Sequence, residues 1–237
     1  MSDILICGDS WGCGEWNVEC TEVLHPGLEW HLKNAGHHVT NISRSGGSNL
    51  DTVNRLSLWL ERFGDDKRYL IFVFQTEYTR DFKHNVDSDW NIDSVTQLSD
   101  QWIARFYMRL SDLAQKYQCD IKIIGGCSDT QWFDNMNLDH PGCEIACQSL
   151  TNLLIYDNHR SNQPVFSWYD KNCVELLDKI KQHGCDKAET LLVLQQGFER
   201  EDLLRSNPQL FFPDGKHPNR QGHKKLFEFL TVQYFCD

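Results

Sequence analysis

Short, continuous apolar runs alternate with segments of helical periodicity along most of the chain. Ile4–Cys7 is such a run and ends at Gly8, which is typical of a strand buried on both faces of a parallel sheet. Residues 23–35 place apolar side chains at helical spacing and stop at Gly36, and residues 39–42 follow as a second strand. The first forty residues therefore predict one β-α-β unit.

The same alternation continues along the chain. It predicts helices at 50–63, 95–117, 173–182, 190–198 and 222–235, and further strands at 69–74 and 121–124. Alternating strands and helices are typical of the α/β fold class, here a three-layer α/β/α sandwich around a mostly parallel, flavodoxin-like central sheet. Because such sheets bind ligands outside the carboxyl ends of their strands, functional residues are expected in the loops that follow strands.

The periodicity is lost between about residues 127 and 170, where Asn, Asp, His, Pro and Trp are frequent. We expect an irregular excursion over the edge of the sheet, with one short strand or helix at 150–156. The chain of 237 residues contains no internal repeat and no low-complexity tract. This length suits one large domain, so residues 1–237 are predicted to form a single domain.

Composition narrows the class of partner. Lys plus Arg is 23 and Asp plus Glu is 34, which gives a net charge of -11. This charge repels phosphate backbones and anionic lipid surfaces, so neither nucleic acid nor a membrane is expected as a partner. Hydrophobic residues at 40% and aromatic residues at 12% exclude a disordered chain.

The cysteines and the apolar runs bear on location. The longest apolar run, residues 69–74, is far shorter than the roughly 20 residues of a membrane span, and no export signal is visible. Ten cysteines in a chain of this size then predict reduced thiols and a cytoplasmic protein. Cys143 and Cys147 have C-x3-C spacing, but no second pair follows at ligand spacing, so no metal is expected.

The loop after the first strand holds a candidate nucleophile. Ser10 follows Gly8-Asp9 directly and is followed by Gly12 and Gly14, so its hydroxyl would lie at the carboxyl edge of the sheet with small neighbours around it. Taken alone, the loop also fits an ordinary strand-to-helix turn in which Ser10 caps the helix.

A candidate base lies more than two hundred residues later, just before the last predicted helix. Asp214 and His217 are three residues apart in a turn rich in Gly and Pro. This spacing allows the carboxylate to hold one ring nitrogen of the imidazole and leaves the other nitrogen free to take a proton from a serine. Alone, the turn also fits a surface loop in which His217 caps the next helix.

Together these blocks resemble the SGNH (GDSL-type) hydrolase family. The first block of that family, G-D-S-x-x-x-G, is matched by Gly8, Asp9, Ser10 and Gly14, and the last block, D-G-x-H-P-N, by Asp214, Gly215, His217, Pro218 and Asn219. Residues 41–48 look like the N-x-x-x-S-G segment, which puts Gly46 where the family places an oxyanion-hole N–H. The order and spacing of the three blocks also agree with the family.

The remaining block departs from the family pattern. The family has G-x-N-D after the third strand, with the Asn side chain donating to the oxyanion, whereas Gln75-Thr76-Glu77 stands here. Glu77 falls at the Asn position, but a carboxylate opposes negative charge, so the Thr76 hydroxyl or the Gln75 amide is the better donor. Arg80 would neutralise Glu77 or contact an acidic substrate.

The resemblance implies an acyl-enzyme mechanism that uses no metal and no cofactor. Ser10 would attack an ester carbonyl, His217 would move the proton, and Asp214 would hold the ring. The N–H groups of Ser10 and Gly46, with one side chain from residues 75–77, would bind the oxyanion. The expected substrate is a small-molecule or glycan ester, with an acetyl or other short acyl group, and Trp11 is a candidate substrate contact.

Other interpretations remain open at this point. Residues 8–12 also fit the G-x-S-x-G elbow of α/β-hydrolases, although in that fold the serine follows several strands. The missing Asn and the eight tryptophans also suit a catalytically weakened protein of the SGNH fold that binds glycans or serves in assembly. A thioesterase or a lipid-directed esterase would use the same triad.

Overall fold

The computed structural model describes residues 1–64, 67–76, 81, 92–126, 130, 141–160, 182, 204–211 and 217–236. The strands in these residues are β1 (Asp3–Cys7), β2 (Glu15–Trp16), β3 (Val23–His25), β4 (His38–Asn41), β5 (Tyr69–Gln75), β6 (Asp120–Gly125) and β7 (Cys143–Cys147). The helices are α1 (Ser10–Cys13), α2 (Leu28–Asn34), α3 (Asn49–Phe63), α5 (Ile92–Tyr117), α6 (Leu150–Tyr156) and α9 (Arg220–Tyr234).

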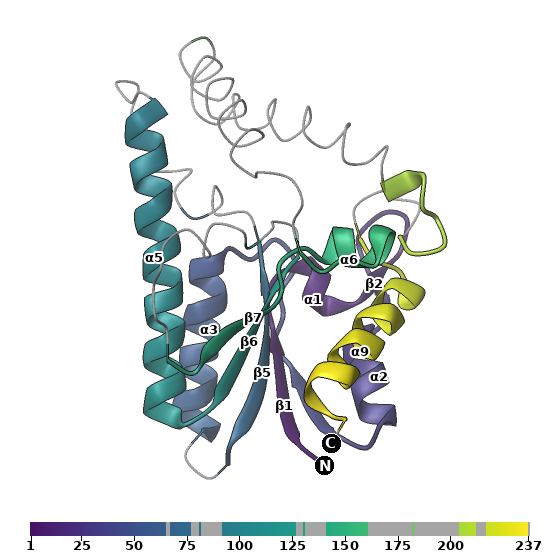
Figure 1. Cartoon of the computed structure of the whole chain (residues 1–237), viewed down its shortest axis with the longest axis horizontal. Coiled ribbons are helices and arrows are strands. Elements are labelled where there is room, and N and C mark those ends of the chain that lie inside the picture. The colour runs from purple at the N-terminus through teal and green to yellow at the C-terminus, as the bar shows by residue number, and fades with distance from the viewer. Residues whose placement is uncertain are drawn as a thin grey trace.

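Five of the strands form one parallel sheet in the order β4-β1-β5-β6-β7 (Figure 1). The predicted α/β class and parallel sheet are therefore confirmed. The sequence did not predict β7, which lies within the segment expected to be irregular. Among the described residues its run Cys-Glu-Ile-Ala-Cys pairs with β6 alone, and it carries a charged side chain at Glu144, so it lacks the continuous apolar pattern of a central strand.

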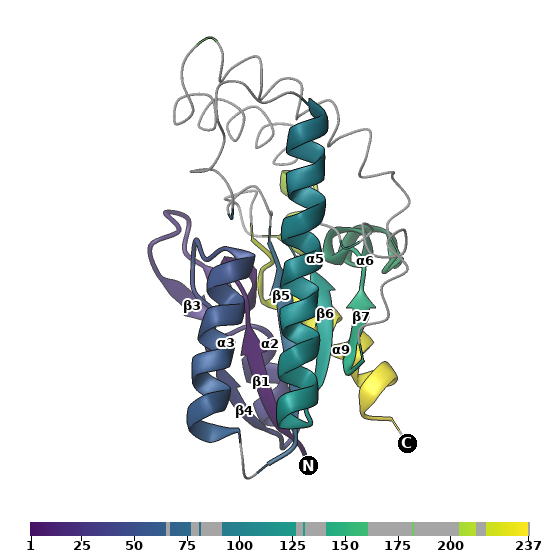
Figure 2. The ribbon, with the colours of Figure 1, turned by 90° about the vertical axis from the view of Figure 1, so that its left-hand side faces the viewer.

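Helices cover both faces of the sheet and make three layers (Figures 1 and 2). Helices α3 and α5 pack on one face, where Leu5 and Cys7 of β1 belong to their core cluster. Helices α2, α6 and α9 pack on the other face, where Ile4 and Ile6 lie. Because successive side chains of a strand point to opposite faces, a strand covered on both sides needs apolar side chains on both, as β1 has from Ile4 to Cys7.

The helix predicted over residues 23–35 is wrong in its first part. Residues 23–25 form β3, which pairs antiparallel with β2, and α2 begins only at Leu28. Pro26 has no N–H to donate and Gly27 has a φ of +57°, so this dipeptide separates strand from helix. Leu24 was one of the residues that gave the segment its helical spacing, yet it is exposed and belongs to the two-stranded ribbon.

The remaining predicted elements within the described residues are found close to their predicted bounds. The predicted helices at 173–182 and 190–198 and most of the predicted excursion lie outside the described residues. In the part of the chain that the structure describes, no helix combines the length and the apolar character that crossing a membrane requires.

A buried histidine joins α9 to the start of α2. His223 is 1% exposed, and its ring packs so closely on Gly27 that a Cβ there would lie 2.8 Å from it. The pKa of His223 is lowered to about 4, chiefly by burial and also by the nearby His31 and His25, against the raising effects of the Gly14 backbone and Glu15. His223 is therefore neutral in the folded protein at physiological pH.

The pKa of His223 predicts a stability that depends on pH. In the unfolded chain the group titrates near 6.5, so between pH 6.5 and 4 the unfolded chain binds a proton that the folded protein does not. Above pH 6.5 we expect this group to cause no loss of stability. Between pH 6.5 and 4 it should lower the free energy of unfolding by about 1.4 kcal/mol per pH unit. Urea unfolding at pH 7, 6 and 5 measures the slope. His223→Gln should flatten it, and His38→Gln, at an exposed histidine, should not. Equal slopes in wild type and His223→Gln would contradict the prediction.

Candidate active site

The turn after β1 presents Ser10 at the carboxyl edge of the sheet (Figure 1). Gly8 has a φ of +151°, and a Cβ there would lie 2.6 Å from Cβ of Phe74 in β5, so only glycine allows the chain to turn this close to its neighbour. Asp9 then caps α1, because its Oδ1 accepts a hydrogen bond from Trp11 N at 3.0 Å. Ser10, at the first position of α1, is 6% exposed.

The start of α9 presents His217, which is 8% exposed. Asn219 caps this helix, and its Oδ1 accepts hydrogen bonds from Gln221 N at 2.9 Å and Gly222 N at 3.1 Å. The preceding Pro218 forms an isolated antiparallel bridge with Phe211. The Pro-Asn pair of the last sequence block therefore fixes where the chain carrying His217 enters the helix.

Trp16 contacts both of these segments. Its Nε1 donates a hydrogen bond to the Ser10 carbonyl oxygen at 2.9 Å, and its ring centroid lies 5.7 Å from that of His217. The Ser10 hydroxyl has no hydrogen-bond partner among the described residues, so the structural link between Ser10 and His217 runs through the indole. The fold thus brings the first and last sequence blocks to one indole ring.

An ion pair next to Trp16 ties the same two segments. The Glu15 carboxylate accepts hydrogen bonds from Arg220 N at 2.6 Å, Nε at 3.0 Å and Nη2 at 3.1 Å. Burial alone would raise the pKa of Glu15, but the hydrogen bonds and charge of Arg220 outweigh it and lower that pKa. Glu15 therefore stays ionised and holds the first turn of α9 at neutral pH.

The loop after β4 contains the predicted oxyanion donor. Asn41 joins this loop to the first one, since its Nδ2 donates to Gly12 O at 2.9 Å and its Oδ1 accepts from Ser43 N at 3.0 Å. Gly46 is exposed and has a φ of +70°. Its N–H has no hydrogen-bond partner in the described part of the chain, so it is available to a ligand.

Arg55, which the sequence analysis did not single out, anchors both loops from α3. Its guanidinium donates to Gly8 O at 3.0 Å and to Ile42 O, and its Nε lies 3.2 Å from Oδ2 of Asp51. Gly8 leads into the loop of Ser10, and Ile42 leads into the loop of Gly46. A fork of planar donors can reach both acceptors at once, which explains why an arginine serves here.

The end of β5 is held by a second residue that the sequence analysis missed. The buried Asn49 bonds to the backbone of Thr76 twice, through Nδ2 to Thr76 O at 2.9 Å and through Oδ1 from Thr76 N at 3.0 Å. The Thr76 N–H is therefore used by Asn49, and Thr76 itself is 1% exposed. At the start of a helix, Asn49 looks from sequence like an ordinary residue of the first turn.

The other residues predicted to serve near the end of β5 differ in whether the structure describes them. Gln75 is buried, and its Oε1 accepts a hydrogen bond from the Tyr107 hydroxyl at 2.5 Å. Glu77 and Arg80, and with them the predicted orienter Asp214, lie outside the described residues. Their roles stay predictions.

Trp11 requires a correction. It was predicted as a substrate contact, but its side chain is 1% exposed and its ring lies 6.4 Å from that of Phe211 inside the core. Trp11 follows Ser10 in sequence, but its ring lies in the core because this face of α1 packs against the layer that contains α9.

The described cysteines are free thiols, namely Cys7, Cys13, Cys20, Cys119, Cys143, Cys147 and Cys236. Burial raises the pKa of Cys7 to about 12 and that of Cys13 to about 11. Cys143 and Cys147 lie at the two ends of β7, about 13 Å apart along a strand, too far to share one metal ion. No group of three His, Cys, Asp or Glu side chains within the described residues could hold a metal.

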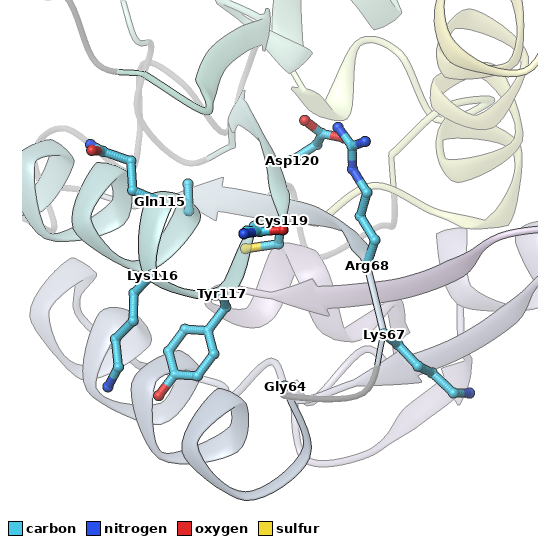
Figure 3. Close-up of a pocket in the computed structure, with 10 residues that line it drawn as sticks. Gly64, Lys67, Arg68, Gln115, Lys116, Tyr117, Cys119 and Asp120 are labelled. Carbon is cyan, nitrogen blue, oxygen red and sulfur yellow. The ribbon is translucent and has the colours of Figure 1, made fainter.

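A pocket of about 740 Å³ lies at the opposite edge of the sheet, at the amino ends of β5 and β6 (Figure 3). Two of its three cations are engaged in ion pairs, since Lys67 Nζ lies 3.0 Å from Asp3 and Arg68 Nη2 lies 2.9 Å from Asp120. The third, Lys116, lies over the ring of Tyr117. Ser10, Gly46 and His217 are not among the residues that line this pocket, so the pocket is separate from the Ser10 site.

No protein-family model matches the chain, and no curated protein matches it. Similar solved structures include TesA (TM-score 0.44, 13% identity, 98% of both chains covered) and a member of the lipolytic protein G-D-S-L family from Veillonella parvula (TM-score 0.44, 14% identity, 98% of this chain and 97% of that chain). A third is the psychrotrophic esterase EstA from Pseudoalteromonas sp., with a TM-score of 0.43, 12% identity and coverage of 98% of this chain and 96% of that chain.

Proposed function

We propose that this protein is a serine hydrolase of the SGNH type that cleaves an O-acyl ester. The observation that carries the proposal is the shared contact of Trp16 with Ser10 and His217, which brings the candidate nucleophile and base to one edge of the sheet. Parallel α/β sheets bind their ligands at this edge. A serine hydroxyl and an imidazole held on the same edge are two groups that acyl transfer uses.

The proposed reaction follows from the chemistry of these groups. The Ser10 hydroxyl attacks the ester carbonyl while His217 takes its proton, and the protonated imidazole then gives that proton to the leaving alcohol. Asp214 is assigned as the group that orients the ring. Water, with His217 again as base, releases the acid and restores Ser10.

The charge that develops on the carbonyl oxygen needs donors. The Gly46 N–H is without a partner in the described chain, and the N–H of Ser10 at the start of α1 is the second proposed donor. Thr76, with Gln75 or Glu77 as alternatives, is the proposed third contributor in place of the family's Asn. Because Asn49 already occupies the Thr76 N–H, the side chain of Thr76 is the part proposed to serve.

The substrate is proposed to be a small-molecule or carbohydrate-linked ester with an acetyl or other short acyl group. The net charge of -11 disfavours strongly anionic polymers. Arg80 is retained as a proposed contact for an acidic group of the substrate.

A fluorophosphonate probe tests the proposal directly, because it phosphonylates only a serine that a base activates. Wild type should be labelled at Ser10, identified by peptide mass spectrometry, and Ser10→Ala should take up no label. Ser2→Ala, at the start of the chain, is the matched control and should label as wild type does. Absence of label at Ser10 in the wild type would favour a binding or assembly protein of the same fold.

A further inference from the structure

A thiol lies beside the imidazole of the proposed active site. Sγ of Cys20, in the turn between β2 and β3, is 3.9 Å from Nδ1 of His217, although the two residues are 197 positions apart. In a serine–histidine pair, the group at the nitrogen away from the serine fixes the tautomer and the orientation of the ring. Cys20 therefore lies beside Nδ1, one of the two ring nitrogens whose hydrogen bonds set the tautomer of His217.

The turn is built to hold this thiol in place. Asn17 Oδ1 accepts hydrogen bonds from Thr21 N at 2.8 Å and Glu22 N at 3.2 Å, and Asn17 Nδ2 donates to Thr21 Oγ1 at 2.9 Å. The Cys20 N–H donates to Asn17 O at 2.9 Å, and Cys20 itself has a φ of +54°. A side chain other than glycine is uncommon in this left-handed conformation, and here the surrounding hydrogen bonds impose it.

The same ribbon holds the rest of the site. Trp16, at the end of β2, bonds to the Ser10 carbonyl and packs on the His217 ring, so Cys20 and Trp16 contact the imidazole from one supersecondary unit. The ribbon therefore meets the proposed base through an aromatic ring and through a sulfur atom.

We propose that Cys20 is a positioning residue for His217, its sulfur accepting the Nδ1–H hydrogen bond that leaves Nε2 free to act as the base. The inference rests on the proposed function and adds the thiol to the predicted carboxylate of Asp214 rather than replacing it. Sulfur is a weak acceptor, so its contribution is that of one modest hydrogen bond.

Kinetics of ester hydrolysis test the positioning role. Cys20→Ala should lower kcat by about 3- to 10-fold with KM unchanged, because one weak hydrogen bond is lost, and Cys20→Ser should restore most of the rate. Cysteine, serine and alanine all carry a Cβ, so the three proteins share the same backbone strain at this position. Cys236→Ala, at an exposed thiol, is the control and should behave as wild type. A wild-type kcat in Cys20→Ala would overturn the inference.

A second measurement does not depend on hydrolysis. In alkylation by iodoacetamide, the Cys20 sulfur bonds to carbon, the carbon–iodine bond breaks, iodide leaves and the thiol proton passes to water, while the Nδ1–H of His217 donates to the thiolate. Because a neighbouring imidazole favours the thiolate, the rate at Cys20 should fall at least about 5-fold from Ser10→Ala to Ser10→Ala with His217→Gln. The rate at Cys236, measured in the same digest, should not change.

The two measurements separate the possible failures. If the rate at Cys20 does not depend on His217, the contact and the inference are overturned, even in a protein that hydrolyses esters. If it does depend on His217 and no ester is cleaved by wild type, the proposed function fails while the thiol–imidazole pair is supported.

Discussion

Replacement of His217 by alanine is expected to lower kcat for p-nitrophenyl acetate by about three orders of magnitude. The imidazole is the proposed acceptor of the Ser10 proton and its donor to the leaving group, and a positioned acid–base group contributes about 10²–10⁴-fold. KM should change little, because His217 is assigned to proton transfer and not to binding of the ester. Initial rates at saturating ester compare kcat of the variant with that of wild type, and circular dichroism gives the amount of folded protein in each sample.

The control for this experiment is His38→Ala, at an exposed histidine that opens β4. It should retain the wild-type rate. Ser10→Ala should match His217→Ala, and the double variant should be no slower than either single variant, because residues that act as one unit are not additive. A His217→Ala protein as active as wild type would rule out the proposed mechanism.

Replacement of Arg55 by methionine is the second change with a large expected effect. It removes the donors to Gly8 O and Ile42 O and leaves the Asp51 carboxylate without its partner on the next turn. Gly8 O keeps the Arg44 N–H as a donor at 3.0 Å, whereas Ile42 O is left without a donor among the described residues. A carbonyl without a donor costs about 1–3 kcal/mol, so the free energy of unfolding should fall by about 1–3 kcal/mol in urea titrations. Because the same bonds set the loops of Ser10 and Gly46, kcat of the folded fraction should also fall by about 10- to 100-fold.

Arg55→Lys should recover part of the stability but little of the rate, since one ammonium group cannot serve two carbonyls in fixed directions. Arg62→Met is the matched control on the same helix, because Arg62 is exposed and lies over the ring of Phe63. A folded fraction of Arg55→Met with wild-type kcat would show that Arg55 only stabilises the fold and does not set the loops.

The sequence predicted the parts of the site that depend on local chemistry. Gly8, Ser10 and His217 stand in short blocks where turn-forming residues follow a strand or precede a helix, so their neighbourhood in the chain already indicates their place. Trp11 shows the limit of this reasoning, because its distance from Ser10 in sequence does not reveal which face of α1 it occupies.

The residues that assemble the site could not be predicted in the same way. Arg55 acts on backbone carbonyls, including that of Gly8 47 positions earlier, and Glu15 holds Arg220 across 205 positions. Backbone acceptors carry no side-chain signature, and a contact over such a separation exists only once the sheet and α9 have formed. The strand β7 was missed for a related reason. Its mixed polar and apolar sequence does not indicate a strand, and its strand conformation depends on hydrogen bonds to β6.

The two ends of the described fold have a practical consequence. β1 begins at Asp3 and α9 finishes at Tyr234 on the same side of the molecule, while α1, whose first residue is Ser10, and the first turn of α9 lie toward the other side (Figure 1). A tether attached at Asp3 or Tyr234 would therefore leave the edge that carries the proposed active site facing away from a bead or chip. Immobilised protein should accept bulky esters as readily as protein in free solution, whichever end carries the anchor.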